Sequence, residues 1–335
     1  MPKVIDYFED TIMPVIRDNH LGILSETSIM ILGSVALGID DELSDLEAAV
    51  YLDDTVWRES GGQLQLTLND CLSKTNPWKN DGSVISVHPL SWLLDGQAKK
   101  FLQSSRNLPW EKVSFETLFT IQNNLIFYDP QDMLNRLRNV TSPSQYPEHL
   151  WKKSLIQRFK TLVEDLSELK LSTKRNRIAE SYIVLGHIIE GLFQIGFLIL
   201  HQYYPWRTHL RWAFDKLPLP TSDLGSKIYS LSTCTEWNRM INIIETIIAT
   251  YQDYINTNSI IPEVNIKCSD IYEELLWAER LQAWKSPNWK KFIYDCKGKA
   301  IESGYESYQF WVWSLWGWVN EELKKDVDGI SIKNS

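Results

Sequence analysis

The chain has 335 residues, which is enough for two domains at roughly 100–200 residues each. Its 43 acidic and 34 basic side chains give a net charge of −9. This balance disfavours a general nucleic-acid binder, whose affinity comes mainly from basic contacts to phosphate. It is compatible with a cationic small-molecule partner.

The sequence carries no sign of secretion or of a membrane anchor. The first ten residues contain acidic side chains and no long apolar run, which disfavours a secretory signal. The most apolar stretch, 183–200, is interrupted by His187, Glu190 and Gln194 and predicts a poor transmembrane helix. We therefore expect a cytoplasmic protein with no membrane partner, whose widely spaced cysteines are reduced thiols.

The first half of the sequence predicts short strands that alternate with helices. An amphipathic helix is expected over 5–18. Apolar runs predict strands over 28–32, 46–52, 83–87 and 125–128. Ser114 is placed to cap a helix ahead of the last strand. These elements indicate a small mixed sheet with helices.

A stretch rich in turn formers, 141–147, separates this half from a sequence dominated by helical periodicity. The expected helices cover 148–171, 178–203, 206–216, 234–255, 271–284 and 308–325. We predict an α+β protein, in which a mixed sheet with helices over 1–140 is followed by an all-helical domain over 148–330.

Gly33 and Ser34 directly follow the first predicted strand, where a helix is about to begin. Such a pair leaves backbone N–H groups free to hold a phosphate. Glycine suits this position because the phosphate must come close to the backbone, and the serine hydroxyl adds one donor. The pair indicates a phosphate-binding turn.

Asp45 and Glu47 stand at the start of the second predicted strand. Side chains at i and i+2 share a strand face, so we expect both carboxylates to project together while Leu46 enters the core. Paired carboxylates repel unless a cation lies between them, and Mg²⁺ takes such ligands while sharing others with substrate phosphates. The combination indicates a phosphoryl-transfer site; the alternative is an acidic, solvent-facing strand edge.

The string GSVALGIDDELSDLEAAVYL (33–52) closely resembles the signature of the nucleotidyltransferase superfamily, a Gly-Ser pair followed by an acid-x-acid strand. Within it, the chain is most similar to the kanamycin-type (aminoglycoside) nucleotidyltransferases. Segments 84–95 and 125–130 resemble that family's next strand and helix and its closing strand, and 162–176 and 198–220 resemble its helical domain.

The resemblance implies Mg²⁺-dependent transfer of a nucleoside monophosphate from a nucleoside triphosphate, with ATP the expected donor, to a hydroxyl. It implies Asp45 and Glu47 as catalytic metal ligands. It also implies Gly33, Ser34 and Ser44 as nucleotide-binding residues.

The resemblance further implies a catalytic base on the first helix of the helical domain. Glu164, Asp165 and Glu168 are the candidates, and the alignment favours Glu168. Lys174, in the basic cluster that follows, is expected to meet the triphosphate. The third carboxylate that many superfamily members carry corresponds to Ser86, with His88 on the same strand face. Neither replaces a Mg²⁺ ligand, so the number of metals stays open.

A polar stripe follows the apolar helix expected over 178–203. It consists of Glu180, His187, Glu190, Gln194 and His201. Buried charges are rarely kept without partners, so the stripe either pairs with other helices or lines a polar cavity. In the second case His187 and Glu190 are the expected binding residues for a cationic, polyamine-like acceptor.

Aromatic side chains crowd the helix expected over 308–325, with tryptophans at positions 311, 313, 316 and 318. This helix either packs on two sides, forms a dimer interface or offers an aromatic wall to a ligand.

The leading hypothesis is a nucleotidyltransferase that modifies a small hydroxylated, cationic acceptor, such as an aminoglycoside-like antibiotic, and so confers resistance. One alternative is nucleotidylation of a protein or an RNA, of which the acidic charge disfavours RNA. Another is a non-catalytic nucleotide-binding regulator on the same scaffold. The resemblance also makes a homodimer conceivable.

Overall fold

The computed structural model describes residues 4–78, 82–103, 108–219, 223–258 and 260. The chain divides into two compact units, one comprising 1–152 with 196–225 and the other 153–195 with 226–335. The two predicted ranges, 1–140 and 148–330, follow one another along the chain, whereas the first unit also contains the later segment 196–225. As functional domains, 1–140 and 148–330 stay predictions.

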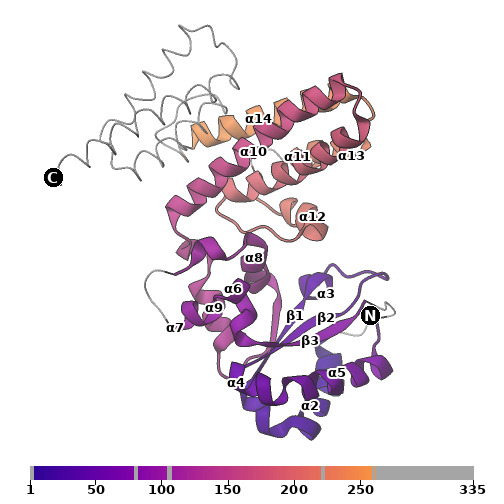
Figure 1. The fold of residues 1–335 in the computed structure, drawn as a ribbon, viewed down its shortest axis with the longest axis vertical. Coiled ribbons are helices and arrows are strands. Elements are labelled where there is room, and N and C mark those ends of the chain that lie inside the picture. Colours follow the sequence, from indigo (N-terminus) through magenta and orange to yellow (C-terminus); the bar gives the residue numbers. More distant parts are fainter. Residues whose placement is uncertain (1–3, 79–81, 104–107, 220–222, 259, 261–335) are drawn as a thin grey trace, which may run out of the picture. The chain divides into compact units, whose positions relative to one another are not determined.

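The first unit is built on a four-stranded mixed sheet (Figure 1). Its strands are β1 (Thr27–Leu32), β2 (Glu47–Leu52), β3 (Val84–Pro89) and β4 (Leu125–Tyr128). Their order is β3-β2-β1-β4, with β1 antiparallel to both neighbours and β2 parallel to β3. Each strand starts within one residue of its expected position, so the predicted α+β class is confirmed.

Helices and helical turns precede, connect and follow these strands. They are α1 (Val4–Tyr7), η1 (Phe8–Ile12), α2 (Met13–His20), η2 (Leu21–Glu26), α3 (Gly33–Leu37), α4 (Asp54–Val56), η3 (Trp57–Gly61), α5 (Gly62–Thr75), η4 (Leu90–Trp92), α6 (Leu93–Gly96), α7 (Ala98–Gln103), η5 (Trp110–Lys112), α8 (Phe115–Asn123), α9 (Met133–Val140), η6 (Pro143–Gln145), η7 (Arg207–His209) and α12 (Leu210–Phe214). Ser114 caps α8 as expected, since its side chain accepts a hydrogen bond from the Thr117 backbone N–H.

One face of the sheet carries the main core of this unit. Ile29 and Ile31 of β1 and Val50 of β2 are fully buried on it, and α2 and α5 cover it (Figure 1). Each such side chain contributes roughly 1.5–3 kcal/mol by leaving water. Glu47 lies an odd number of positions from Val50 along β2, so its side chain belongs to the other face of the sheet.

Residues 196–225 join the first unit through aromatic packing. The Tyr203 hydroxyl donates to the Thr141 carbonyl at 3.0 Å, and the Tyr204 ring stacks on Phe115 at a centroid distance of 5.1 Å. The helix expected over 206–216 is wrong in detail. A 3₁₀ turn, η7, and the short α12 occupy this range, and the buried residues 203–205 ahead of them are not helical.

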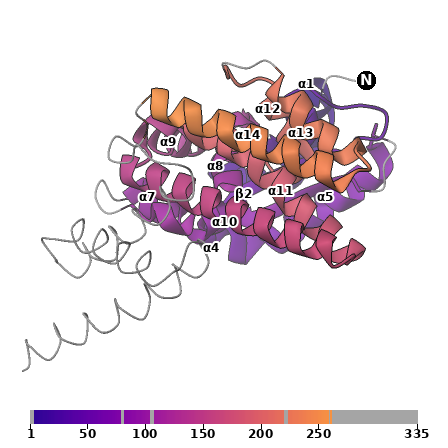
Figure 2. The same ribbon diagram turned by 90° about the horizontal axis from the view of Figure 1, so that it is seen from above.

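The second unit is helical throughout its described residues. α10 (Glu148–Lys174) begins in the first unit and continues into the second, and α11 (Ile178–Ile199) begins in the second and ends in the first; α13 (Leu224–Thr233) and α14 (Trp237–Thr257) are its other described helices (Figure 2). The Tyr251 hydroxyl of α14 donates to the Leu192 carbonyl of α11 at 2.7 Å. Lys170 of α10 pairs with Glu245 of α14 at 2.6 Å. The expected helices over 271–284 and 308–325, with their tryptophans, lie outside the described residues.

α11 is long and apolar enough, by composition, to cross a membrane. Within the structure, 61% of the qualifying segment is buried. A buried core helix has the same composition, so this feature alone does not indicate a membrane span.

Asp129, which follows β4, links the end of this strand to β1 and to α9 by hydrogen bonds. Its carboxylate accepts hydrogen bonds from the Ser28 hydroxyl at 2.9 Å and from the backbone N–H groups of Met133 and Asn135 at 2.9 and 3.0 Å. It thereby caps the first turn of α9 while holding β1.

We expect Asp129→Ala to lower the free energy of unfolding by about 2 kcal/mol, because it leaves several donors without their charged acceptor. Urea denaturation followed by circular dichroism measures the change. The matched control is Asp70→Ala, which removes an exposed carboxylate paired with Lys74. Such surface pairs contribute at most about 1 kcal/mol, so equal losses in the two variants would contradict this role for Asp129.

Candidate functional site

The candidate site lies at the end of the sheet where one strand finishes and others begin. Leu32, the last residue of β1, pairs with Glu47, the first residue of β2. Ile31 pairs with Leu125, the first residue of β4. Because β1 is antiparallel to both neighbours, Gly33 and the residues that precede β2 and β4 are brought to one edge.

Gly33 and Glu47 are in close contact at this edge. Gly33 has a φ of +65°, and a Cβ atom built on it would lie 2.6 Å from Oε2 of Glu47. A side chain at position 33 would therefore adopt a strained backbone conformation and displace the Glu47 carboxylate. The positive φ favours glycine at the start of α3, and the absence of a Cβ there lets the Glu47 carboxylate keep its position.

The burial of the side chains alternates along Asp45-Leu46-Glu47 as it does along a strand. The pairing of β2 with β1 nevertheless begins only at Glu47. Leu46 is fully buried and Asp45 is half-buried, whereas Glu47 keeps part of its surface exposed and part covered by the protein. The Leu46 N–H donates to the Ser83 hydroxyl at 3.0 Å, and the Leu46 carbonyl accepts from the Val84 N–H at 2.7 Å. These bonds fix the backbone between the two carboxylates.

The surroundings of Glu47 disfavour its charge. Partial burial raises the pKa of Glu47, and the neighbouring carboxylate of Asp45 raises it further. The imidazole of His209 acts in the opposite direction and lowers the pKa. A pair of carboxylates that repel each other in this way is a site that a cation would stabilise.

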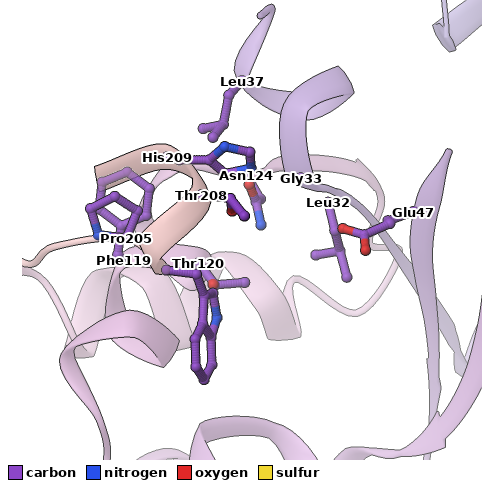
Figure 3. A pocket seen from close by; sticks show the side chains of 11 residues that line it. Leu32, Gly33, Leu37, Glu47, Phe119, Thr120, Asn124, Pro205, Thr208 and His209 are labelled. Carbon is purple, nitrogen blue, oxygen red and sulfur yellow. The ribbon is translucent and has the colours of Figure 1, made fainter. Parts of the chain in front are cut away.

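A cavity of about 290 Å³ opens beside Glu47. Its lining comes entirely from the first unit. It is lined by Leu32, Gly33, Leu37, Glu47, Phe119, Thr120, Asn124, Pro205, Trp206, Thr208 and His209. Figure 3 shows the side chains of Glu47, Asn124 and His209 around this one space.

The residues present fit a divalent metal that takes only part of its coordination from the protein. Within the described ranges, no three or more His, Cys, Asp or Glu side chains form a group able to hold a metal ion. Asp45 and Glu47 supply two hard oxygen donors of the kind that Mg²⁺ prefers. Mg²⁺ commonly takes one or two carboxylates and completes its octahedron with water and substrate phosphates.

The two serines expected to bind nucleotide lie near this edge but differ in their surroundings. Ser34 stands in α3, and its hydroxyl has no hydrogen-bond partner among the described residues. The Ser44 hydroxyl is engaged in a turn, since it accepts from the Asp41 N–H at 2.9 Å and donates to the Asp41 carboxylate at 3.0 Å. Ser44 therefore shapes the chain that leads to Asp45.

The third strand brings no carboxylate to Glu47. Its residue beside Glu47 is Val84, whereas Ser86 and His88 pair further along with Ala49 and Tyr51. The Ser86 hydroxyl donates to the Ala48 carbonyl at 3.3 Å. The His88 ring stacks on Trp92, and burial lowers its pKa.

The remaining predicted site residues belong to the second unit. Glu168 and Lys174 are exposed on α10, and His187 is exposed on α11. Glu190 accepts a hydrogen bond from the Gln194 amide at 3.2 Å.

Asp165 of the second unit lies in a charged group on α10 and α11. Its pKa is raised chiefly by burial. His187 lowers it, Glu168 and Glu164 raise it, and Arg158 lowers it. His187 and Glu168 are therefore both close to Asp165.

Four residues that line the cavity were not predicted from the sequence: Phe119, Asn124, Trp206 and His209. Asn124 directly precedes the predicted strand over 125–128. Its position at the start of that strand could have indicated that it lies at the same end of the sheet as the candidate site. For Trp206 and His209 no local signal existed, because nothing in their own segment shows that the chain returns to the first unit.

The chain is similar to a family model and to a solved structure. Residues 110–213 match the family model described as a domain of unknown function, DUF4037. No curated protein matches the sequence. A solved structure of a nucleotidyltransferase-like protein from Exiguobacterium sibiricum is similar, with a TM-score of 0.37 and 13% identity over 76% of this chain and 81% of that chain. Neither match singles out the kanamycin-type enzymes.

We expect Glu47→Gln to raise the melting temperature at neutral pH, because it removes a charge that burial and Asp45 disfavour. A carboxyl whose pKa is raised on folding loses stability as the pH rises above its ordinary value of 4.5. The gain over the unchanged protein should therefore vanish as the pH falls below that value. Differential scanning calorimetry across pH measures it, and a gain independent of pH would contradict the electrostatic origin.

Proposed function

We propose that this chain is a Mg²⁺-dependent nucleotidyltransferase that moves a nucleoside monophosphate from a nucleoside triphosphate, ATP first, to a hydroxyl of a small acceptor. The observation that carries the proposal is the contact between Glu47 and Gly33 at the strand edge that also holds Asp45. It puts a carboxylate pair against a backbone that phosphate can approach closely.

Asp45 and Glu47 are the residues that would hold the metal. When bound, Mg²⁺ would offset the charge on the reacting phosphate. The protein's own part is to hold two carboxylates on a rigid strand, so that their repulsion favours cation binding. Gly33 and Ser34 would contact the phosphates through the backbone and the unpartnered hydroxyl.

The reaction follows from these positions. The acceptor hydroxyl oxygen attacks the α-phosphorus and forms a new P–O bond, while the bond to the β-phosphate oxygen breaks and pyrophosphate leaves. The hydroxyl proton passes to a base. Glu168 is the proposed base, and Lys174 the proposed contact of the triphosphate. Asp165 is a second candidate base, since its raised pKa favours proton uptake.

The acceptor we propose is small, hydroxylated and cationic, in keeping with the net charge of −9. His187 and Glu190 are the residues that we propose to contact its amines. An aminoglycoside-like antibiotic meets this description, and its modification by a cytoplasmic enzyme would confer resistance.

We expect Asp45→Asn to lower Mg²⁺-dependent transfer by at least about a hundredfold, because an amide cannot hold the cation as a carboxylate does. The fold should be unchanged, since Asp45 is half-buried and makes no structural hydrogen bond among the described residues. Pyrophosphate release from each of the four nucleoside triphosphates, with an aminoglycoside and lincosamide panel, measures the loss.

Three results separate the possible functions. Acceptor-dependent release that disappears in Asp45→Asn supports the transferase and identifies its substrate class. Unchanged activity in that variant overturns the site. Nucleotide binding with no pyrophosphate release in the presence of any acceptor would favour the non-catalytic regulator. The absence of a carboxylate beside Glu47 on β3 motivates that alternative.

Gly33→Ala and Gly38→Ala form a matched pair for the phosphate turn. Both glycines have positive φ, +65° and +67°, so each alanine costs roughly 1–2 kcal/mol of backbone strain. Only the Cβ at position 33 meets Glu47, and nothing lies within 4 Å of one at position 38. We expect similar losses of stability by urea denaturation. Calorimetry should show weakened Mg-ATP binding in Gly33→Ala alone, and equal binding by both variants would count against the turn.

A further inference from the structure

We propose that the cavity beside Glu47 is the acceptor subsite, and that it takes one hydroxylated, uncharged or cationic ring whose polar groups are read by Asn124. The inference rests on the proposed function and deepens it. It places the ring that carries the reacting hydroxyl in a cavity lined by the first unit.

Asn124 is the polar group that the rest of the fold leaves for a ligand. The residue is only 7% exposed. Its N–H donates to the Thr120 carbonyl at 3.1 Å, and its own carbonyl accepts from Arg138 at 2.6 Å. Its side-chain amide has no hydrogen-bond partner among the described residues and points into the cavity (Figure 3). The amide nitrogen and oxygen are not themselves fully buried, so they are open to the hydrogen-bonding groups of a ligand in the cavity.

Away from Gly33, which the proposed function assigns to the phosphates, the charge of the lining favours a neutral or cationic group. Among the described residues that line the cavity, none is Lys or Arg, and the ionisable ones are Glu47 and His209. Backbone N–H groups and a metal ion would hold the phosphates beside Gly33, whereas a phosphate elsewhere in the cavity would have no Lys or Arg partner. A neutral or cationic ring with hydroxyl groups instead suits Glu47, the Asn124 amide and the hydroxyl of Thr208.

The size and the walls of the cavity fit one ring. Its volume of about 290 Å³ is at the low end for a small-molecule site. Phe119, Pro205 and Trp206 supply apolar and aromatic surface that covers a ring face. Trp206 is 61% exposed, so it lies at the rim and leaves room for the rest of a larger acceptor.

The position relative to Glu47 favours the acceptor over the nucleobase. Gly33 and Glu47 themselves line the cavity. The attacking hydroxyl must lie next to the phosphorus, and hence next to the metal-binding carboxylates. A nucleobase is separated from the α-phosphate by the ribose, so it is the poorer occupant.

The test uses the full chain and two sets of probes. Saturation-transfer NMR measures binding of single rings, namely 2-deoxystreptamine, D-glucosamine and myo-inositol, with adenosine as competitor. Calorimetry measures Mg-ATP separately. We expect at least one ring to bind and adenosine not to displace it. Asn124→Leu should weaken ring binding about tenfold or more while leaving Mg-ATP affinity within about twofold.

Asn123→Leu is the matched control, because Asn123 adjoins Asn124 but is exposed and does not line the cavity. Thr208→Val is a second lining variant at an exposed position, available if Asn124→Leu does not fold, and it too should weaken ring binding. The proposal is overturned if no ring binds, if adenosine displaces the ring, or if the lining variants bind as the control does. Failure of the proposed function is seen separately, as Mg-ATP binding that Asp45→Asn does not alter.

Discussion

The antiparallel register between β1 and β2 is the constraint on which the site depends. Leu32 opposes Glu47, so the turn at Gly33 begins where the acidic strand starts. A shift of one residue would bring Glu47 to the core face and Leu46 to the solvent face. The fully buried Leu46 makes that shift costly, and the core beneath the sheet therefore holds the carboxylates in place.

The same arrangement carries an electrostatic cost. The partial burial of Glu47 and its proximity to Asp45 both oppose its ionisation. The unit tolerates this because the other face of the sheet is a continuous apolar core on α2 and α5. Electrostatic repulsion held on a rigid scaffold is typical of functional sites. It is the physical basis for proposing a cation at this position.

The return of the chain to the first unit completes the cavity. Pro205, Trp206 and His209 lie within 196–225 and form one of its walls. Tyr203 and Tyr204 anchor this wall, through a hydrogen bond to Thr141 and stacking on Phe115. The lining thus combines strand ends that are close in the sheet with a segment distant in sequence. Such a cavity depends on the aromatic packing as much as on the sheet.

Local pattern in the sequence determined the strands, the α+β class and the Gly33–Ser34 and Asp45–Glu47 pairs, because alternation and turn chemistry act over a few residues. The cap at Ser114 and the apolar stripe of α10 were predictable for the same reason. Only the tertiary structure decided that Glu47 contacts Gly33, that Val84 rather than Ser86 lies beside it, and that Asn124 and His209 share its cavity. Strand register and the return of a distant segment are set by long-range packing, which periodicity does not encode.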